Sequence, residues 1–270
     1  MRRHKGLLPG PVSYRTDALE HAEISGRLVS GLRGSADLSG KLPAVFDQAE
    51  CEGCWAHALA NIVGAVTGHL ASPLYFMQSN YARLRGIANP TGNLPPLYDG
   101  GSQLSDAAAS AAQLGWLPYQ APQQNGGTDV PATIDMRGNA VPLPELTPDQ
   151  VATGMGETFA GEYAITADGV AADVLAAALE AGIYVWDGFE VDDACENLKA
   201  GHVLGAPTGP NLGGHSTLYW GYETLSDGSR VFHKRNSWGK SWCDGGDYLV
   251  NDAHVAAAWA LWPMPIRVAS

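Results

Sequence analysis

The segment that decides the fold directly precedes and opens the strongest helix pattern, and it reads Asp47-Gln48-Ala49-Glu50-Cys51-Glu52-Gly53-Cys54-Trp55-Ala56. From Cys54 to Gly68, apolar residues recur at the three-and-four spacing of an amphipathic helix, and Gly68 is a typical stop. Cys54 therefore falls in the first turn of the predicted helix, where the helix dipole favours a thiolate. A cysteine in that place is a candidate nucleophile.

Two segments far downstream carry the groups that a cysteine nucleophile needs. His215 follows two glycines, and Asn236 begins an Asn-Ser-Trp-Gly run. An imidazole serves as the base, and a side-chain amide that accepts from its other ring nitrogen fixes the tautomer. His215 and Asn236 fit these roles, and Trp238 would cover their contact. The oxyanion needs donors, for which the Cys54 backbone N–H and the Gln48 side-chain amide are the candidates.

Length and composition limit which classes of protein this chain can belong to. The 270 residues are enough for one large domain or for two lobes that share a cleft, and 45% hydrophobic residues predict a packed core. The net charge of −12 disfavours nucleic acid as a partner and is typical of a soluble protein. No apolar run reaches the roughly 18 residues of a membrane span, and no long apolar stretch follows the basic start. We expect a soluble protein with no membrane partner and no signal peptide, and we assign no compartment.

Helical patterns dominate the first half of the chain, and strand patterns the second. Further helices are predicted at residues 74–84, from 102 or 104 to 114, and at 171–181. Strands are predicted at residues 183–186, 216–222, 231–235 and 247–250. This order is typical of an α+β protein with two unlike lobes. A cleft between them would have Cys54 on a helical wall and His215 on a strand wall.

Four stretches carry weaker patterns. Residues 1–36 predict an N-terminal extension with at most one helix, at 18–32. Residues 42–46 predict a short extended entry, because Pro43 disfavours helix. Residues 120–150 are rich in Pro, Gly, Asn and Asp, which predicts a long loop between the lobes. The apolar segment 254–262 is too short for a membrane span and predicts a core segment.

Together these segments resemble the papain-like cysteine peptidases, the family that contains the cathepsins. The resemblance runs in order over residues 37–262. It rests on the opening segment and on Asp99-Gly100-Gly101, Gly213-Gly214-His215-Ser216-Thr217-Leu218-Tyr219-Trp220-Gly221-Tyr222 and Lys234-Arg235-Asn236-Ser237-Trp238-Gly239-Lys240-Ser241-Trp242. It implies an α+β, papain-like two-lobed fold, with a helical lobe and an antiparallel β-barrel-like lobe around the active-site cleft. The implied peptidase domain spans residues 37–266, divided into a mainly helical lobe (37–125) and a mainly β lobe (126–266).

The resemblance implies a catalytic role for each matching residue. Cys54 is the nucleophile of a cysteine-type endopeptidase, and His215 is the acid and base. Asn236 orients His215, and Gln48 forms the oxyanion hole with the Cys54 N–H. Trp238 supports this group, as does Trp55 beside the nucleophile. The resemblance implies no metal and no cofactor.

The resemblance also implies residues that bind a polypeptide substrate, namely Gly100, Gly101, Gln103, Leu104 and Gly214. Gly100 and Gly101 would offer their backbone to an extended peptide, as an added strand does. Gln103 and Leu104 would lie near the subsite for the residue two before the scissile bond.

Departures from the family pattern point to a distinct member. Glu52 and Gly53 replace the family's Gly-Ser, and Glu52 would raise the Cys54 pKa if its side chain faces inward. Few residues precede the matching region, which resembles shorter bacterial or bacteriophage members. Since a long inhibitory pro-segment is not evident, we expect residues 1–36 to lie across the cleft as a plug.

The four cysteines are too few for a disulfide-built scaffold. Cys51 matches a cysteine that the family usually pairs, but Tyr98 stands where its partner would be. Cys51 is therefore either free or paired with Cys195 or Cys243.

Other interpretations of these residues stay open. The chain could be a catalytically silent papain-like module, such as a component of a virion or another larger assembly. It could be an amidase or transpeptidase that acts on cell-wall peptides. Cys51 and Cys54 could form a redox dithiol or half of a metal site, although no second ligand pair lies at a suitable spacing. His57 lies too close to Cys54 along the helix to act as the cleft base and is interpreted as packing or surface.

Overall fold

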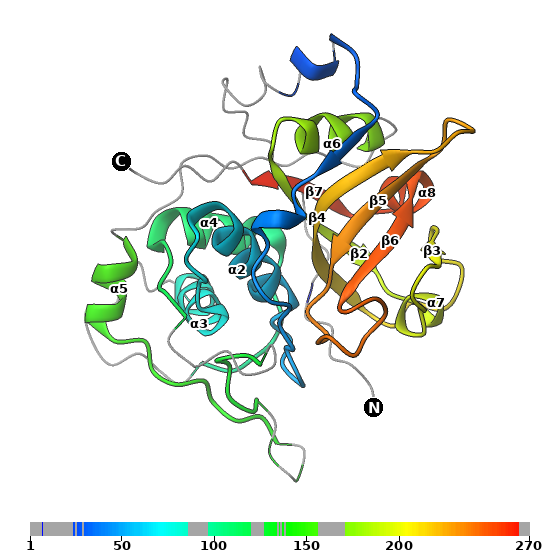
Figure 1. Cartoon of the computed structure of the whole chain (residues 1–270). Coiled ribbons are helices and arrows are strands. Elements are labelled where there is room, and N and C mark those ends of the chain that lie inside the picture. Colours follow the sequence, from blue (N-terminus) through cyan, green and yellow to red (C-terminus); the bar gives the residue numbers. More distant parts are fainter. Residues whose placement is uncertain are drawn as a thin grey trace.

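The computed structural model describes residues 7, 24, 26–28, 30–85, 97–119, 127–133, 135, 137, 139–155 and 171–264. Two unlike parts lie side by side in it (Figure 1). One part is made of helices, and the other is a twisted, mostly antiparallel sheet with further helices packed on it. Helix α2 (Cys54–Thr67) lies between them and packs against the central strand β4 (Gly214–Thr224). The α+β architecture expected from the order of the patterns is confirmed.

The helical part contains α2, α3 (Pro73–Leu84), α4 (Leu104–Leu114) and α5 (Pro148–Met155). Gly68, with φ of 74°, ends α2, and Gly115, with φ of 67°, ends α4, because glycine adopts positive φ without a steric penalty. Ser72 caps α3 by accepting from the backbone N–H of Tyr75 at 3.0 Å. The helices predicted at 54–68, at 74–84 and from 104 to 114 are confirmed.

The loop predicted at residues 120–150 is wrong at its end, where α5 begins at Pro148. Thr147 and Gln150 form a reciprocal capping box: Thr147 N donates to Gln150 Oε1 at 2.9 Å, and Gln150 N donates to Thr147 Oγ1 at 3.3 Å. Pro148 takes the first helical position, where its fixed φ suits the helix. This pattern is the signal that the loop prediction overlooks. Residues 120–126, 134, 136 and 138 lie outside the described residues.

In the described part of the chain the sheet runs in the order β3-β6-β5-β4-β2-β7, and β1 also pairs with β4. Its strands are β1 (Ser35–Asp37), β2 (Tyr184–Glu190), β3 (Val203–Leu204), β4, β5 (Arg230–Arg235), β6 (Asp247–Asn251) and β7 (Ala260–Met264). The remaining elements are η1 (Ser39–Lys41), α6 (Ala171–Glu180), α7 (Asp193–Glu196) and α8 (Asp252–Ala256). The predicted helix 171–181 and the four predicted strands are confirmed, and the strands extend further than predicted.

The structure adds detail to two predictions from the weaker patterns. The last residues of the extension 1–36 form part of β1, which pairs with β4 from Ser35↔Glu223 to Asp37↔Gly221. The predicted core segment 254–262 is largely buried, and it spans the end of α8 and the start of β7. The helix predicted at 18–32 is seen only at residues 24, 26–28 and 30, because its other residues up to 29 lie outside the described ones.

The sheet separates two hydrophobic clusters. One collects side chains of α2 to α5 and includes Trp186 and Leu218 from the sheet. The other lies under the opposite face and includes Phe189 and Tyr219. Successive strand residues point to opposite faces, so Leu218 and Tyr219 belong to different clusters. No helix in the described part of the chain is long and apolar enough to span a membrane.

Candidate active site

Cys54 is the first residue of α2 and is fully buried. The carbonyl of Gly53 accepts from the backbone N–H groups of Ala56 and His57, each at 3.0 Å, and so closes the first turn. A Cβ at Gly53 would lie 2.5 Å from Met77 Sδ, so a larger residue would displace Met77 from the helix start. The predicted first-turn position of Cys54 is confirmed, and the positive end of the helix dipole favours its thiolate there.

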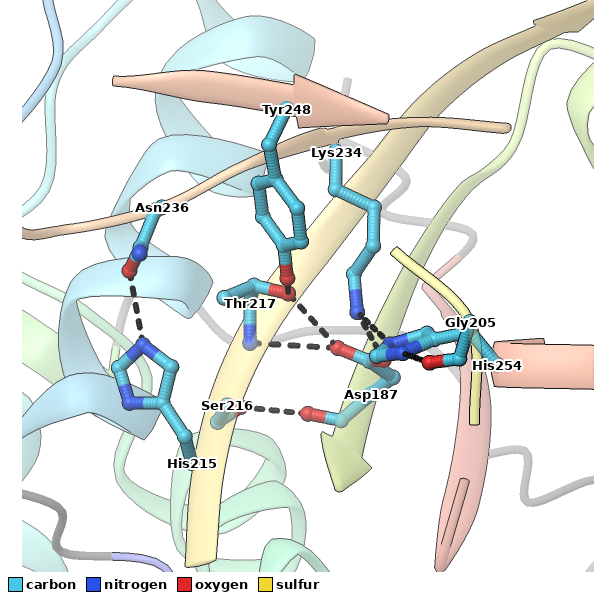
Figure 2. Close-up of polar contacts among 9 residues, drawn as sticks. All are labelled: Asp187, Gly205, His215, Ser216, Thr217, Lys234, Asn236, Tyr248 and His254. Carbon is cyan, nitrogen blue, oxygen red and sulfur yellow. Dashed lines mark hydrogen bonds and ion pairs between the residues drawn. The ribbon is translucent and has the colours of Figure 1, made fainter. Parts of the chain in front are cut away.

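His215 on β4 and Asn236, which directly follows the neighbouring strand β5, form a buried pair (Figure 2). His215 Nε2 donates to Asn236 Oδ1 at 2.7 Å. An amide oxygen can only accept, so the neutral imidazole carries its proton on Nε2 and Nδ1 is its basic nitrogen. Trp238 stacks on the imidazole with ring centroids 4.5 Å apart, and this shields the hydrogen bond from water. The structure thus brings together three residues that the sequence places in one site.

Gln48 is tied to the segment that follows Asn236. Gln48 N donates to Ser237 O at 2.8 Å, and Ser237 Oγ donates to Gln48 Oε1 at 2.6 Å. Gln48 Nε2 donates to Cys51 O at 2.7 Å, which uses one of the two hydrogens on that nitrogen. These bonds join the turn before Cys54 to the segment that carries Asn236, while α2 packs on the strand that carries His215.

Comparison with known proteins bears on the fold. No protein-family model and no curated protein matches the sequence. Among solved structures, the chain is similar to xylellain, a cysteine protease from Xylella fastidiosa, with a TM-score of 0.67 and 21% identity over 99% of this chain and 98% of that one. The chain has the papain-like fold.

Two further structures show the same papain-like fold. Procathepsin L 3 from the larval midgut of Tenebrio molitor has a TM-score of 0.59 and 18% identity over 87% of this chain and 70% of that one. ProCathepsin B S9 from Trypanosoma congolense has a TM-score of 0.61 and 15% identity over 99% and 87%.

His57 is buried in the papain-like fold and has both ring nitrogens engaged. Nδ1 lies 2.7 Å from Gly53 O, and Nε2 lies 2.7 Å from Thr128 Oγ1. Burial lowers the pKa of His57 to about 4, so the ring is neutral near pH 7. His57 therefore holds the start of α2 in place, in agreement with its interpretation as a packing residue.

Asp99 links the glycine loop to the loop before Cys54. Its carboxylate accepts from Glu52 N at 2.6 Å and from the Tyr81 hydroxyl at 3.0 Å. Burial raises the pKa of Asp99 above its ordinary value, and these hydrogen bonds oppose that shift. The link stands where the papain-like resemblance would place a disulfide. Sequence reasoning missed it, because an aspartate beside glycines is usually a turn residue.

None of the four cysteines, all of which lie in the described part of the chain, forms a disulfide, so the open question about Cys51 is answered. Cys51 is buried, and burial raises the pKa of its thiol well above the ordinary value. Cys51 is therefore a poor nucleophile, although it lies three residues from Cys54. Among the described residues, no group of three or more His, Cys, Asp or Glu side chains is placed to hold a metal ion.

The predicted substrate-binding residues lie on two elements that face each other across Leu7. Gly101 has φ of 71° and leads through Gln103, the N-cap residue of α4, into the buried Leu104. Leu7 N donates to Gly214 O at 3.1 Å, and Leu7 also forms a bridge to Ser102. Gly100, which directly precedes Gly101, is exposed.

The side chain of Leu7 fills the space above β2. It is 4% exposed, and a Cβ built on Gly188 would meet Leu7 Cδ2 first and Leu104 Cδ1 next. Leu7 therefore lies between Ser102 and Gly214, where the predicted substrate-binding residues would hold a peptide. Residues 1–6, 8–23, 25 and 29 of the expected plug lie outside the described residues.

Trp55 belongs to the hydrophobic cluster of the helical part. It is fully buried and packs edge-to-face on Tyr81 with ring centroids 6.1 Å apart. Its support for Cys54 thus comes from anchoring the first turn of α2.

Proposed function

We propose that this chain is a cysteine peptidase that cleaves peptide bonds through an acyl-enzyme on Cys54. The observation that carries the proposal is the buried His215–Asn236 pair, which Trp238 covers and which the neighbouring Ser237 joins to Gln48. The papain-like fold adds support but does not suffice, because one fold hosts many activities.

In the proposed reaction the Cys54 thiolate attacks the carbonyl carbon of the scissile peptide. The carbonyl oxygen becomes an oxyanion, which the Cys54 N–H and the Gln48 side-chain amide stabilise. His215 then gives its Nδ1 proton to the leaving amine, and the C–N bond breaks. Water, deprotonated by His215, attacks the thioester and releases Cys54. Asn236 keeps the other proton on Nε2 throughout.

The proposed substrate is an extended polypeptide. Gly214 O accepts a backbone N–H from Leu7, so it is placed to accept one from a substrate. Gly100 and Gly101 would supply the opposite backbone, and Leu104 and Gln103 would contact a side chain near the scissile bond. An apolar residue such as leucine fits the space that Leu7 occupies.

Covalent trapping tests the proposal directly. The full chain is exposed to an epoxysuccinyl inhibitor of cysteine proteases, and intact mass with peptide mapping locates the adduct. We expect one adduct on Cys54 and none in Cys54→Ala. If neither the full chain nor a folded Leu7→Asp variant is labelled, the site is inert, and a silent structural module explains the fold better. If Cys54 is labelled but the chain cleaves only cell-wall peptides and no protein substrate, the chain is an amidase instead.

Removing the Leu7 contact is expected to raise peptide cleavage about tenfold, chiefly by lowering KM, because a tethered segment competes at a high effective concentration. In Leu7→Asp a carboxylate would replace a side chain that is 4% exposed, and its desolvation expels the segment. Initial rates on a peptide substrate measure the effect.

Leu28→Asp is the matched control, because Leu28 lies in the same N-terminal region but is 38% exposed. Its rate should stay at the wild-type value. Equal rates for wild type and a folded Leu7→Asp would contradict the plug. Deleting residues 1–36 is a poorer test, because it removes Ser35 and Ala36 of β1.

A further inference from the structure

A buried ion pair lies beside the His215–Asn236 pair (Figure 2). Asp187 on β2 and Lys234 on β5 are both fully buried, and Lys234 Nζ lies 2.5 Å from Asp187 Oδ2. Moving two charges out of water is costly, and an apolar pair of similar volume is often as stable. Stability alone is therefore a weak reason for this pair.

Asp187 joins three strands. Its Oδ1 accepts from Thr217 N at 3.2 Å and from Thr217 Oγ1 at 3.0 Å, both on β4. Its Oδ2 accepts from Lys234 on β5, while its own backbone belongs to β2. Tyr248 on β6 closes the group with its hydroxyl 3.1 Å from Thr217 Oγ1.

The ammonium of Lys234 is enclosed on its other sides. His254 Nε2 lies 3.3 Å from Lys234 Nζ, and His254 Nδ1 lies 3.3 Å from Gly205 O. Burial and the Lys234 charge hold the pKa of His254 well below its ordinary value. The neutral ring therefore accepts at Nε2 from Lys234 and donates from Nδ1 to Gly205. Lys234 Nζ also lies 4.0 Å from the centroid of the Phe189 ring.

The strand register connects this group to the imidazole. Residues two apart on a strand share a face. Thr217 is two residues from His215, Lys234 is two residues from Asn236, and Asp187 is two residues from Phe189. On the face of the sheet that carries Asp187 and Thr217, β4 therefore carries His215 and β2 carries Phe189, while β5, which carries Lys234, leads directly into Asn236.

Phe189 is the direct link between the two groups. Its ring meets the His215 ring at 75° with centroids 5.7 Å apart, and it meets His254 at 63° and 4.9 Å. The Lys234 ammonium lies over the face of the same Phe189 ring. A shift of Lys234 would thus move both Phe189 and the end of β5, which directly precedes Asn236.

We propose that the Asp187–Lys234 pair positions His215, by fixing the spacing of β2, β4 and β5 so that the imidazole meets Asn236 in one tautomer. The proposal rests on the catalytic role given above to His215. Asp187 and Lys234 are positioning residues, since neither contacts the reacting thiol.

Asp187→Asn and Lys234→Met test this role, because the first removes the negative charge of the pair and the second removes the positive charge. Asn keeps the shape of Asp187 but can turn an N–H toward the ammonium, and Met fills the volume of the Lys234 stem without a donor. Glu180→Gln is the matched control, because Glu180 is a buried carboxylate that accepts from Tyr222 on the same strand β4, far from His215. The readouts are the tautomer of His215 by ¹⁵N NMR and kcat and KM on a peptide.

We expect one Nε2–H tautomer in the wild type and in Glu180→Gln, and a mixture of tautomers in both test variants. We expect kcat to fall about tenfold in them while KM stays within about twofold, because misplacing a catalytic group slows chemistry more than binding. Folded test variants with the wild-type tautomer and kcat would overturn the proposal.

Two safeguards keep the test decisive. If a single variant does not fold, the double variant Asp187→Leu with Lys234→Met removes both charges, a change that proteins often tolerate. It should show the same tautomer mixture, and a wild-type tautomer in it would refute the positioning role. The NMR readout needs no turnover, so a chain that cleaves no peptide contradicts the proposed function while the tautomer still decides this inference.

Discussion

Cys54→Ala is expected to abolish peptide cleavage, with a fall in kcat of about 10⁴-fold or more, because the acyl-enzyme has no other attachment atom. Cys54 is the only one of the four cysteines at the start of a long helix, where the dipole favours a thiolate. Cleavage of a fluorogenic peptide, with circular dichroism to show that the variant folds, measures the effect.

Cys51→Ala is the matched control for this prediction. Cys51 is also a buried free thiol and lies in the same loop, but burial raises the pKa of its thiol well above the ordinary value. Its contact with Gln48 runs through its backbone oxygen, which the substitution keeps. We expect kcat within a few-fold of wild type. Activity that survives in Cys54→Ala and disappears in Cys51→Ala would move the nucleophile to Cys51.

His215→Ala is expected to lower kcat by a similar factor, about 10⁴-fold, because the thiol loses its base and the leaving amine loses its proton donor. No other histidine in the described residues replaces it in this arrangement. His57 has both nitrogens bonded and a pKa of about 4, and His254 is held by Lys234 and Gly205.

His233→Gln is the matched control, because His233 lies on the adjacent strand β5 with its side chain 25% exposed and packs on Trp220. Steady-state kinetics and the rate of thiol alkylation at pH 6 are measured for both variants. We expect His215→Ala to lose both peptide cleavage and thiol alkylation at pH 6, and His233→Gln to keep both. Full alkylation at pH 6 in His215→Ala would show that Cys54 does not depend on this imidazole, and the proposed pairing would fail.

Much of the fold follows from local patterns. Helix α2 combines apolar spacing with a glycine stop, so its limits are predicted almost to the residue. The central strands carry enough β-branched and aromatic residues to be recognised, although β2 and β4 extend beyond the predicted limits because pairing continues through residues with weak propensity. Strand β1 is three residues long with no buried side chain, and only backbone pairing with β4 makes it a strand.

Some residues of the candidate site can likewise be recognised from the sequence, and others cannot. Gln48, Cys54, His215 and Asn236 can be named from the sequence, because their chemical types and order form a recognisable set. The carboxylate of Asp99 that ties two loops together has no signal of that kind, since its partners are a backbone N–H and a distant hydroxyl.

The sequence by itself determined the α+β class, the helix that begins at Cys54 and the residue types of the site, since each of these can be recognised from short local segments of the chain. Only the tertiary structure decided that Leu7 lies on Gly214 and that Asp187 meets Lys234, 47 residues further along the chain. Such contacts depend on strand register, which brings distant residues onto one face. A buried charge pair is stable only where that register supplies each partner with donors and acceptors, and no local pattern encodes this.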